Sequence, residues 1–132
     1  MIVNKMVDAR NTALKVLMTL DRERQTLDGI LDDITPRTGG LSRRDRALFN
    51  ALLYGVLRWR NRLDYIISHF SNIPLKKIEP GVLNILRLGL FQIIYLDRIP
   101  DSATVNTAVE LTRQIGASRA AGFVNALLRK IA

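Results

Sequence analysis

The stretch VLNILRLGLFQIIYL, residues 82–96, decides the fold class of this 132-residue chain. Its apolar residues recur on most sides of a helix rather than along one stripe, and such a helix belongs at the centre of a bundle. Pro80 suits the first position of this helix. Asn84, Arg87 and Gln92 interrupt the run, so it lacks the roughly 18 uninterrupted apolar residues of a membrane span.

The segments on either side predict further helices and no strand, because their apolar residues recur at spacings of three and four. Ser42 is the expected N-cap of the longest helix, and Pro36 is expected to end the second. The expected helices around the central one span about 8–22, 26–35, 42–70, 102–115 and 118–131. We therefore predict an all-α bundle of six or seven helices that forms one domain over residues 1–132.

Two glycines lie inside helical patterns, Gly55 in the long helix and Gly89 in the central one. Each costs on the order of 1 kcal/mol relative to alanine in such a position. Close approach of another helix is the physical reason for tolerating them, and we expect helix crossings at both positions.

The charge balance is the most informative part of the composition. Twenty Lys and Arg against 12 Asp and Glu give a net charge of +8 and a pI near 10.6. This excess predicts attraction to a polyanion, with nucleic acid first and an anionic membrane surface second, although solubility alone could also explain it. No apolar segment resembling a secretory signal opens the chain, so a cytoplasmic location is expected.

The composition also excludes several chemistries. The chain has no cysteine and a single histidine, His69, so it has no thiol nucleophile, no disulfide and no thiolate zinc site. The only adjacent glycines, Gly39 and Gly40, do not follow a predicted strand and are not expected to form a nucleotide-binding turn. We therefore expect no catalytic residue, no metal and no cofactor in this chain.

The first basic cluster consists of Arg43, Arg44 and Arg46, in the first turn of the long helix. Positive charge there opposes the helix dipole and lowers stability. A bound phosphate would offset that cost, since free N–H groups at the helix N-terminus lie beside the guanidinium groups. The alternative is that these arginines are solvated or pair with a carboxylate such as Asp45 or Glu79.

The second basic cluster is RWRNR, residues 58–62, followed later in the chain by Lys76 and Lys77. An aromatic side chain between basic ones is typical of surfaces that stack unpaired RNA bases. Trp59, however, falls on the apolar stripe of the long helix and is expected to be buried.

Arg58 and Arg62 lie one helical turn apart beside Tyr54 and Tyr65, and this face is the better candidate for RNA contact. The alternative is an ion pair that fixes Arg58 within the fold. Its candidate partners are Asp64 and Asp97.

Two consecutive predicted helices each carry a Val-Asn pair, in IPDSATVNTAVELTRQIG and in GFVNALLRKIA. These segments resemble the C-terminal signature of the NusB-like superfamily, and the resemblance covers nearly the whole chain. Asn106 and Asn125 of these pairs are expected to be buried and to tie helices together by hydrogen bonds. The upstream segments ARNTALKVL, LSRRDRALFNALLYGVLRWRNRLDYII and VLNILRLGLFQIIYLDRIP are similar to the superfamily in the same order.

Two families share this fold, the transcription antitermination factor NusB and the N-terminal domain of ribosomal RNA small subunit methyltransferase B. YGVLRW followed by LDYII, and the ending Leu-Leu-Arg in GFVNALLRKIA, are similar to the methyltransferase form. NusB has an arginine-rich N-terminal run that helps to hold its RNA, and the corresponding stretch NKMVDAR keeps Lys5 and Arg10.

The resemblance to the methyltransferase form implies a non-catalytic, RNA-binding domain that positions small-subunit ribosomal RNA for cytosine-C5 methylation. A linked catalytic domain would supply the cysteine nucleophile and bind S-adenosylmethionine. The alternative is a free-standing antitermination regulator. The expected partners are ribosomal RNA and the linked methyltransferase domain, with a homodimer left open and no membrane. The candidate RNA-binding residues are Lys5, Arg10, Arg43, Arg44, Arg46, Arg58, Arg62, Lys76 and Lys77.

Overall fold

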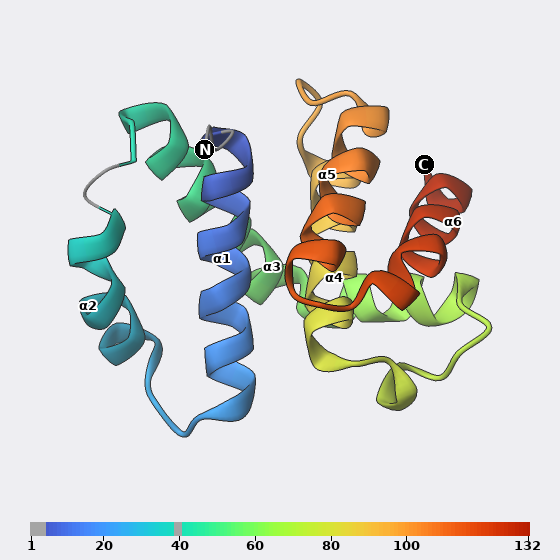
Figure 1. Ribbon diagram of the computed structural model, residues 1–132, viewed down its shortest axis with the longest axis horizontal. Helices are drawn as coiled ribbons and strands as arrows, with labels where there is room; N and C mark the ends of the chain where they lie inside the picture. Colours follow the sequence, from blue (N-terminus) through green and yellow to red (C-terminus); the bar gives the residue numbers. More distant parts are fainter. Residues whose placement is uncertain (1–4, 39–40) are drawn as a thin grey trace.

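The computed structural model describes the backbone of residues 5–38 and 41–132 and the side chains of residues 9–34 and 41–132. Within these ranges the chain forms six α-helices, two short 3-10 helices and no strand (Figure 1). The α-helices are α1 (Lys5–Arg22), α2 (Leu27–Thr38), α3 (Arg43–Phe70), α4 (Pro80–Tyr95), α5 (Asp101–Gln114) and α6 (Ala121–Ile131). The 3-10 helices are η1 (Leu75–Lys77) and η2 (Ser118–Ala120). The predicted all-α class is confirmed.

Helix α4 is the central element, as its apolar circumference predicted. It packs against α1, α3, α5 and α6, and Figure 1 shows α1 and α2 on one side of the molecule with α5 and α6 on the other. Within the stretch from Gly81 to Gln92, only Leu83 is not buried. No helix in the described ranges combines the length and apolar character needed to cross a membrane.

The helix ends agree with the capping signals in some places and differ in others. Ser42 is the N-cap of α3, and its hydroxyl accepts a hydrogen bond from the backbone N–H of Asp45 at 3.1 Å. Pro80 begins α4 as predicted. The prediction that Pro36 ends the second helix is wrong, because α2 continues to Thr38. A proline lacks the N–H for one helical hydrogen bond and its ring crowds the carbonyl of residue i−4, and α2 ends two residues after Pro36.

Both helical glycines lie at helix crossings, as predicted. A Cβ atom at Gly55 of α3 would lie 2.1 Å from Cζ of Phe91 in α4. A Cβ atom at Gly89 of α4 would lie 2.8 Å from Cδ1 of Leu128 in α6. Each glycine therefore lets a large side chain of the neighbouring helix pack against its backbone.

Replacing Gly55 with alanine is expected to lower the free energy of unfolding by about 1–3 kcal/mol, because the added methyl group has no space beside Phe91. The ring of Phe91 also packs against Tyr95, at 5.2 Å between centroids, which restricts its movement. Urea denaturation measures the change. Gly122→Ala in α6 is the control, since no atom lies within 4 Å of its Cβ position. This control is expected to gain up to about 1 kcal/mol from helix propensity. Equal effects of the two substitutions would contradict the packing argument.

Candidate nucleic-acid interface

The exposed side of α3 gathers arginine and tyrosine side chains along one face. With 3.6 residues per turn, this face is opposite the stripe that packs into the core, and Arg46 lies at its edge. Its exposed arginines and tyrosines, which we call the α3 face, are Arg43, Arg44, Arg46, Tyr54, Arg58, Arg62 and Tyr65. Between Arg43 and Arg62 the helix rises by roughly 29 Å, at about 1.5 Å per residue. The α3 face is therefore long enough to follow a polymer rather than a small ion.

No carboxylate neutralises the arginines of the α3 face in the part of the chain that the structure describes. Asp45 is buried, with 4% of its surface exposed, and Asp64 pairs with Arg87. Glu79, the other predicted partner of the first cluster, pairs with Arg119. The predicted alternative that these arginines form ion pairs therefore does not hold within the described residues.

The aromatic residues near the second cluster divide into two groups. Trp59 is half-buried and packs against the core, where it stacks on Tyr95 with 5.5 Å between ring centroids and 16° between planes. Arg58 pairs with neither Asp64 nor Asp97 but lies over the ring of Trp59, 5.3 Å from its centroid. Tyr54 and Tyr65 are 49% and 72% exposed, so they are the aromatic rings available for stacking.

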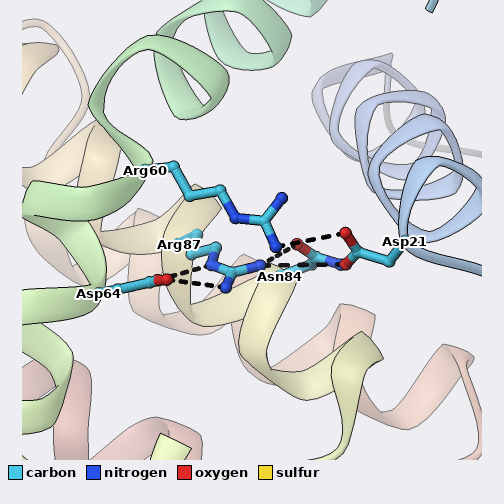
Figure 2. Close-up of polar contacts among 5 residues, drawn as sticks. All are labelled: Asp21, Arg60, Asp64, Asn84 and Arg87. Atoms are coloured by element: carbon cyan, nitrogen blue, oxygen red, sulfur yellow. Dashed lines mark hydrogen bonds and ion pairs between the residues drawn. The ribbon is translucent and has the colours of Figure 1, made fainter. Parts of the chain in front are cut away.

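A network of polar side chains joins α1, α3 and α4 beside this surface (Figure 2). Arg87 of α4 donates from Nε and Nη2 to the two carboxylate oxygens of Asp64 in α3, at 2.7 and 2.9 Å. Its Nη1 donates to Oδ1 of Asn84 at 2.9 Å, and Asn84 in turn donates from Nδ2 to Asp21 of α1 at 2.9 Å. Arg60 of α3 reaches the other carboxylate oxygen of Asp21 at 3.3 Å.

This network is structural, because the Arg87 side chain is only 5% exposed and its donors are occupied by Asp64 and Asn84. It also engages the carboxylates of Asp21 and Asp64. Sequence reasoning missed it. The available signal was the pair Asn84 and Arg87, three residues apart within an otherwise apolar helix.

Lys76 and Lys77 of η1 are exposed but are not part of the α3 face. Lys76 borders a cleft of about 340 Å³ together with Arg60 and Arg87. Lys77 borders a different and more apolar cleft of about 220 Å³, beside Phe123. Lys76 therefore lies near Arg60 of the predicted second cluster, whereas Lys77 borders a separate cleft.

Known proteins resemble this helical bundle in both sequence and fold. The model of the NusB family matches residues 7–132. The transcription antitermination protein NusB of Bacillus velezensis is 34% identical over 128 residues, which cover 93% of this chain and 92% of that protein. The chain belongs to the NusB family. The family model and the helical bundle together confirm the NusB-like resemblance that the sequence motifs indicated.

Relatives of this NusB-family chain also include methyltransferases. The probable ribosomal RNA small subunit methyltransferase B of Bacillus subtilis is 37% identical over 127 residues. The match covers 96% of this chain and 28% of that protein, so the chain spans little more than a quarter of its methyltransferase relative. The solved structure of antitermination factors NusB and NusE in complex with dsRNA superimposes with a TM-score of 0.85 at 21% identity. It covers 98% of this chain and 97% of that one, and shows that the fold is shared.

The N-terminal stretch of this NusB-family chain buries Arg10 instead of exposing it. Arg10 was predicted to contact RNA, but it is 1% exposed and donates from Nε to Oε1 of Gln92 in α4 at 2.7 Å. Burial lowers the pKa of its guanidinium below the ordinary value. Arg10 is therefore an interior residue that joins α1 to α4. Lys5, the other predicted RNA contact in this stretch, lies outside the residues whose side chains the structure describes.

The two Val-Asn pairs of the NusB-like signature also differ from the prediction. Asn106 is exposed on α5, and Asn125 is half-buried on α6, where its Oδ1 accepts a hydrogen bond from Nε of Arg129 at 2.9 Å. The expected burial of both asparagines is therefore wrong. They do not tie α5 to α6, because the bond of Asn125 stays within its own helix.

Proposed function

We propose that this NusB-family chain binds RNA through the α3 face and positions small-subunit ribosomal RNA for a cytosine-C5 methyltransferase. The observation that carries the proposal is the gathering of arginines without carboxylate partners on one exposed helix face. Such a surface attracts a polyanion and holds it in one orientation along the helix. A net charge of +8 supports the same partner.

The α3 face offers two kinds of contact to RNA. Guanidinium groups donate paired hydrogen bonds to phosphate oxygens, and these contacts set the position of the bound strand without reading its sequence. Tyr54 and Tyr65 supply exposed rings on which unpaired bases can stack. Contacts of these kinds would orient a folded RNA so that one base faces a linked enzyme.

The methyl transfer itself would belong to a linked catalytic domain. Cytosine-C5 methylation needs a cysteine nucleophile, and this chain has none. S-adenosylmethionine, the methyl donor of such enzymes, would also bind there, since the described residues form no strand to build a doubly wound nucleoside pocket. This assignment is supported by the 37% identity to a methyltransferase relative. We propose a cytoplasmic location, where ribosomal RNA is modified.

A second candidate function is that of a free-standing antitermination regulator. It is favoured by the NusB of Bacillus velezensis, which this chain matches over 92% of that protein's length. Reading the gene beyond the codon for Ala132 distinguishes the candidates. A continuing frame that encodes a cysteine-bearing methyltransferase domain supports the first, and a stop codon supports the second.

RNA binding is tested by measuring the affinity for a labelled small-subunit ribosomal RNA fragment across a series of salt concentrations. Five arginines that each release a counterion are expected to give a log-log slope of about −3 to −5. A slope near zero would reject the proposed function, because it would mean that phosphate contacts contribute nothing. An Arg24→Gln variant is the control, since Arg24 is exposed in the loop between α1 and α2, and its slope is expected to stay close to that of the original chain.

A further inference from the structure

We infer that a cleft between α5 and α6 binds one unpaired RNA nucleotide, with Arg113 contacting its phosphate and Asn106 and Asn125 hydrogen-bonding its base. This inference rests on the proposed function and adds a site separate from the α3 face, since no residue of α3 lines the cleft. The cleft has a volume of about 480 Å³, within the roughly 300–1,000 Å³ typical of small-molecule sites. Its lining residues are Asn106, Val109, Arg113, Ala121, Gly122 and Asn125.

Three of the lining residues are unfavourable in a helix, and packing explains neither Asn106 nor Gly122, which are both exposed. Asparagine and glycine both have lower helix propensity than alanine, and Asn106, Gly122 and Asn125 all lie within helices. At Gly55 and Gly89 a side chain from another helix fills the space of the missing Cβ, but at Gly122 nothing lies within 4 Å. Helix-unfavourable residues that gather around one cleft, two of them without a packing role, are expected where a ligand binds.

The polar groups of the cleft are free to bind an acceptor. Because Oδ1 of Asn125 accepts from Arg129, its Nδ2 group remains available as a donor. In the described part of the chain, the exposed side chain of Asn106 forms no side-chain hydrogen bond and the exposed Arg113 forms no ion pair. All three side chains therefore keep donors that a ligand can use.

The lining contains no carboxylate that would repel a phosphate. Glu110 is close in sequence, but it accepts from Gln114, which in turn accepts from Asn11 of α1. Glu110 thus has a partner on its own helix, and it is not among the residues that line the cleft. A guanidinium and two carboxamides then match the two parts of a nucleotide, because guanidinium groups bind phosphate and asparagine can pair with the edge of an exposed base.

The test is an NMR titration of the whole chain with each of the four ribonucleoside monophosphates, following the side-chain amides of Asn106 and Asn125. We expect both amides to shift and one base to bind more tightly than the others. Arg113→Gln is expected to weaken all four nucleotides by about tenfold or more, the loss of one charge-assisted hydrogen bond. Asn106→Ala is expected to reduce the preference among bases. Arg24→Gln and Asn72→Ala, which change exposed residues elsewhere, are the controls.

The outcomes separate this inference from the proposed function. If the ribosomal RNA fragment binds with a steep salt dependence but nucleotides at millimolar concentration leave both amides unmoved, the cleft inference is overturned and the proposed function stands. The same holds if the amides respond only to an Asp- and Glu-rich peptide, which would indicate a protein partner. If nucleotides shift the amides but the fragment does not bind at any salt concentration, the proposed function and the assignment to RNA both fail.

Discussion

Replacing both Arg43 and Arg44 with glutamate is expected to lower the affinity for a small-subunit ribosomal RNA fragment by roughly 10²–10⁴-fold. Each substitution removes a charge-assisted hydrogen bond to phosphate worth about 1.5–3 kcal/mol and puts a negative charge in its place. The same double substitution is expected to stabilise the protein by about 0.3–1 kcal/mol per site, because both positions lie in the first turn of α3, where acidic residues suit the helix dipole. Fluorescence anisotropy and thermal unfolding measure the two effects.

Opposite changes in affinity and stability make this result hard to attribute to misfolding. The control is Lys15→Glu with Arg24→Glu, which changes the net charge equally at exposed positions outside the α3 face. This control is expected to weaken binding far less, through the general field of the protein alone. If both double variants lose the same affinity, RNA is attracted by net charge and the α3 face has no special role.

Arg87→Ala is expected to lower the free energy of unfolding by about 3 kcal/mol. The substitution removes the bidentate partner of Asp64 and the hydrogen bond to Asn84, and it leaves the partly buried carboxylate of Asp64 without compensation. The expected value is at the lower end of the range for broken buried ion pairs, because the Asp64 side chain is still 23% exposed. Urea denaturation gives the change in free energy.

Arg60→Ala is the matched control for this second experiment. Arg60 contacts the same network through Asp21, but its side chain is 40% exposed. Solvent screens such a pair, so its loss is expected to cost less than about 1 kcal/mol. Equal losses in the two variants would show that burial does not govern the strength of this network.

The fold could be predicted from the sequence because its decisive signals are local. A helix that is apolar on most sides needs neighbours on most sides, and this requirement placed α4 at the centre. Gly55 and Gly89 marked crossings because glycine inside a helix needs a reason. Helical spacing likewise placed Arg58 and Arg62 beside Tyr54 and Tyr65 on one side of α3. It did not join them to Arg43, Arg44 and Arg46, which were predicted as a separate cluster.

The errors concern polar residues whose surroundings depend on the rotation of a helix against its neighbours. Arg10 lies one turn before Ala13 and Leu14 on the apolar stripe of α1, a signal that it faces the interior. Its basic side chain was nevertheless assigned to the surface, because its partner Gln92 lies 82 residues away in sequence. Asn106 shows the opposite error, because it was predicted to be buried and is exposed. Its position between Val105 and Thr107 does not decide whether the side chain faces solvent or a neighbouring helix.

The polar side chains of α4 have a consequence for how uniquely this bundle is assembled. A helix that is apolar on every side could shift along its axis or rotate against its neighbours and still bury nearly the same apolar surface. Asn84, Arg87 and Gln92 form hydrogen bonds with partners on α1 and α3. These bonds can form together at only one rotation of α4 about its axis. A shift of α4 by one residue would rotate it by about 100° and leave the charge of Arg87 without its carboxylate partner. These three residues therefore favour one register of α4 over other registers that would bury almost as much apolar surface.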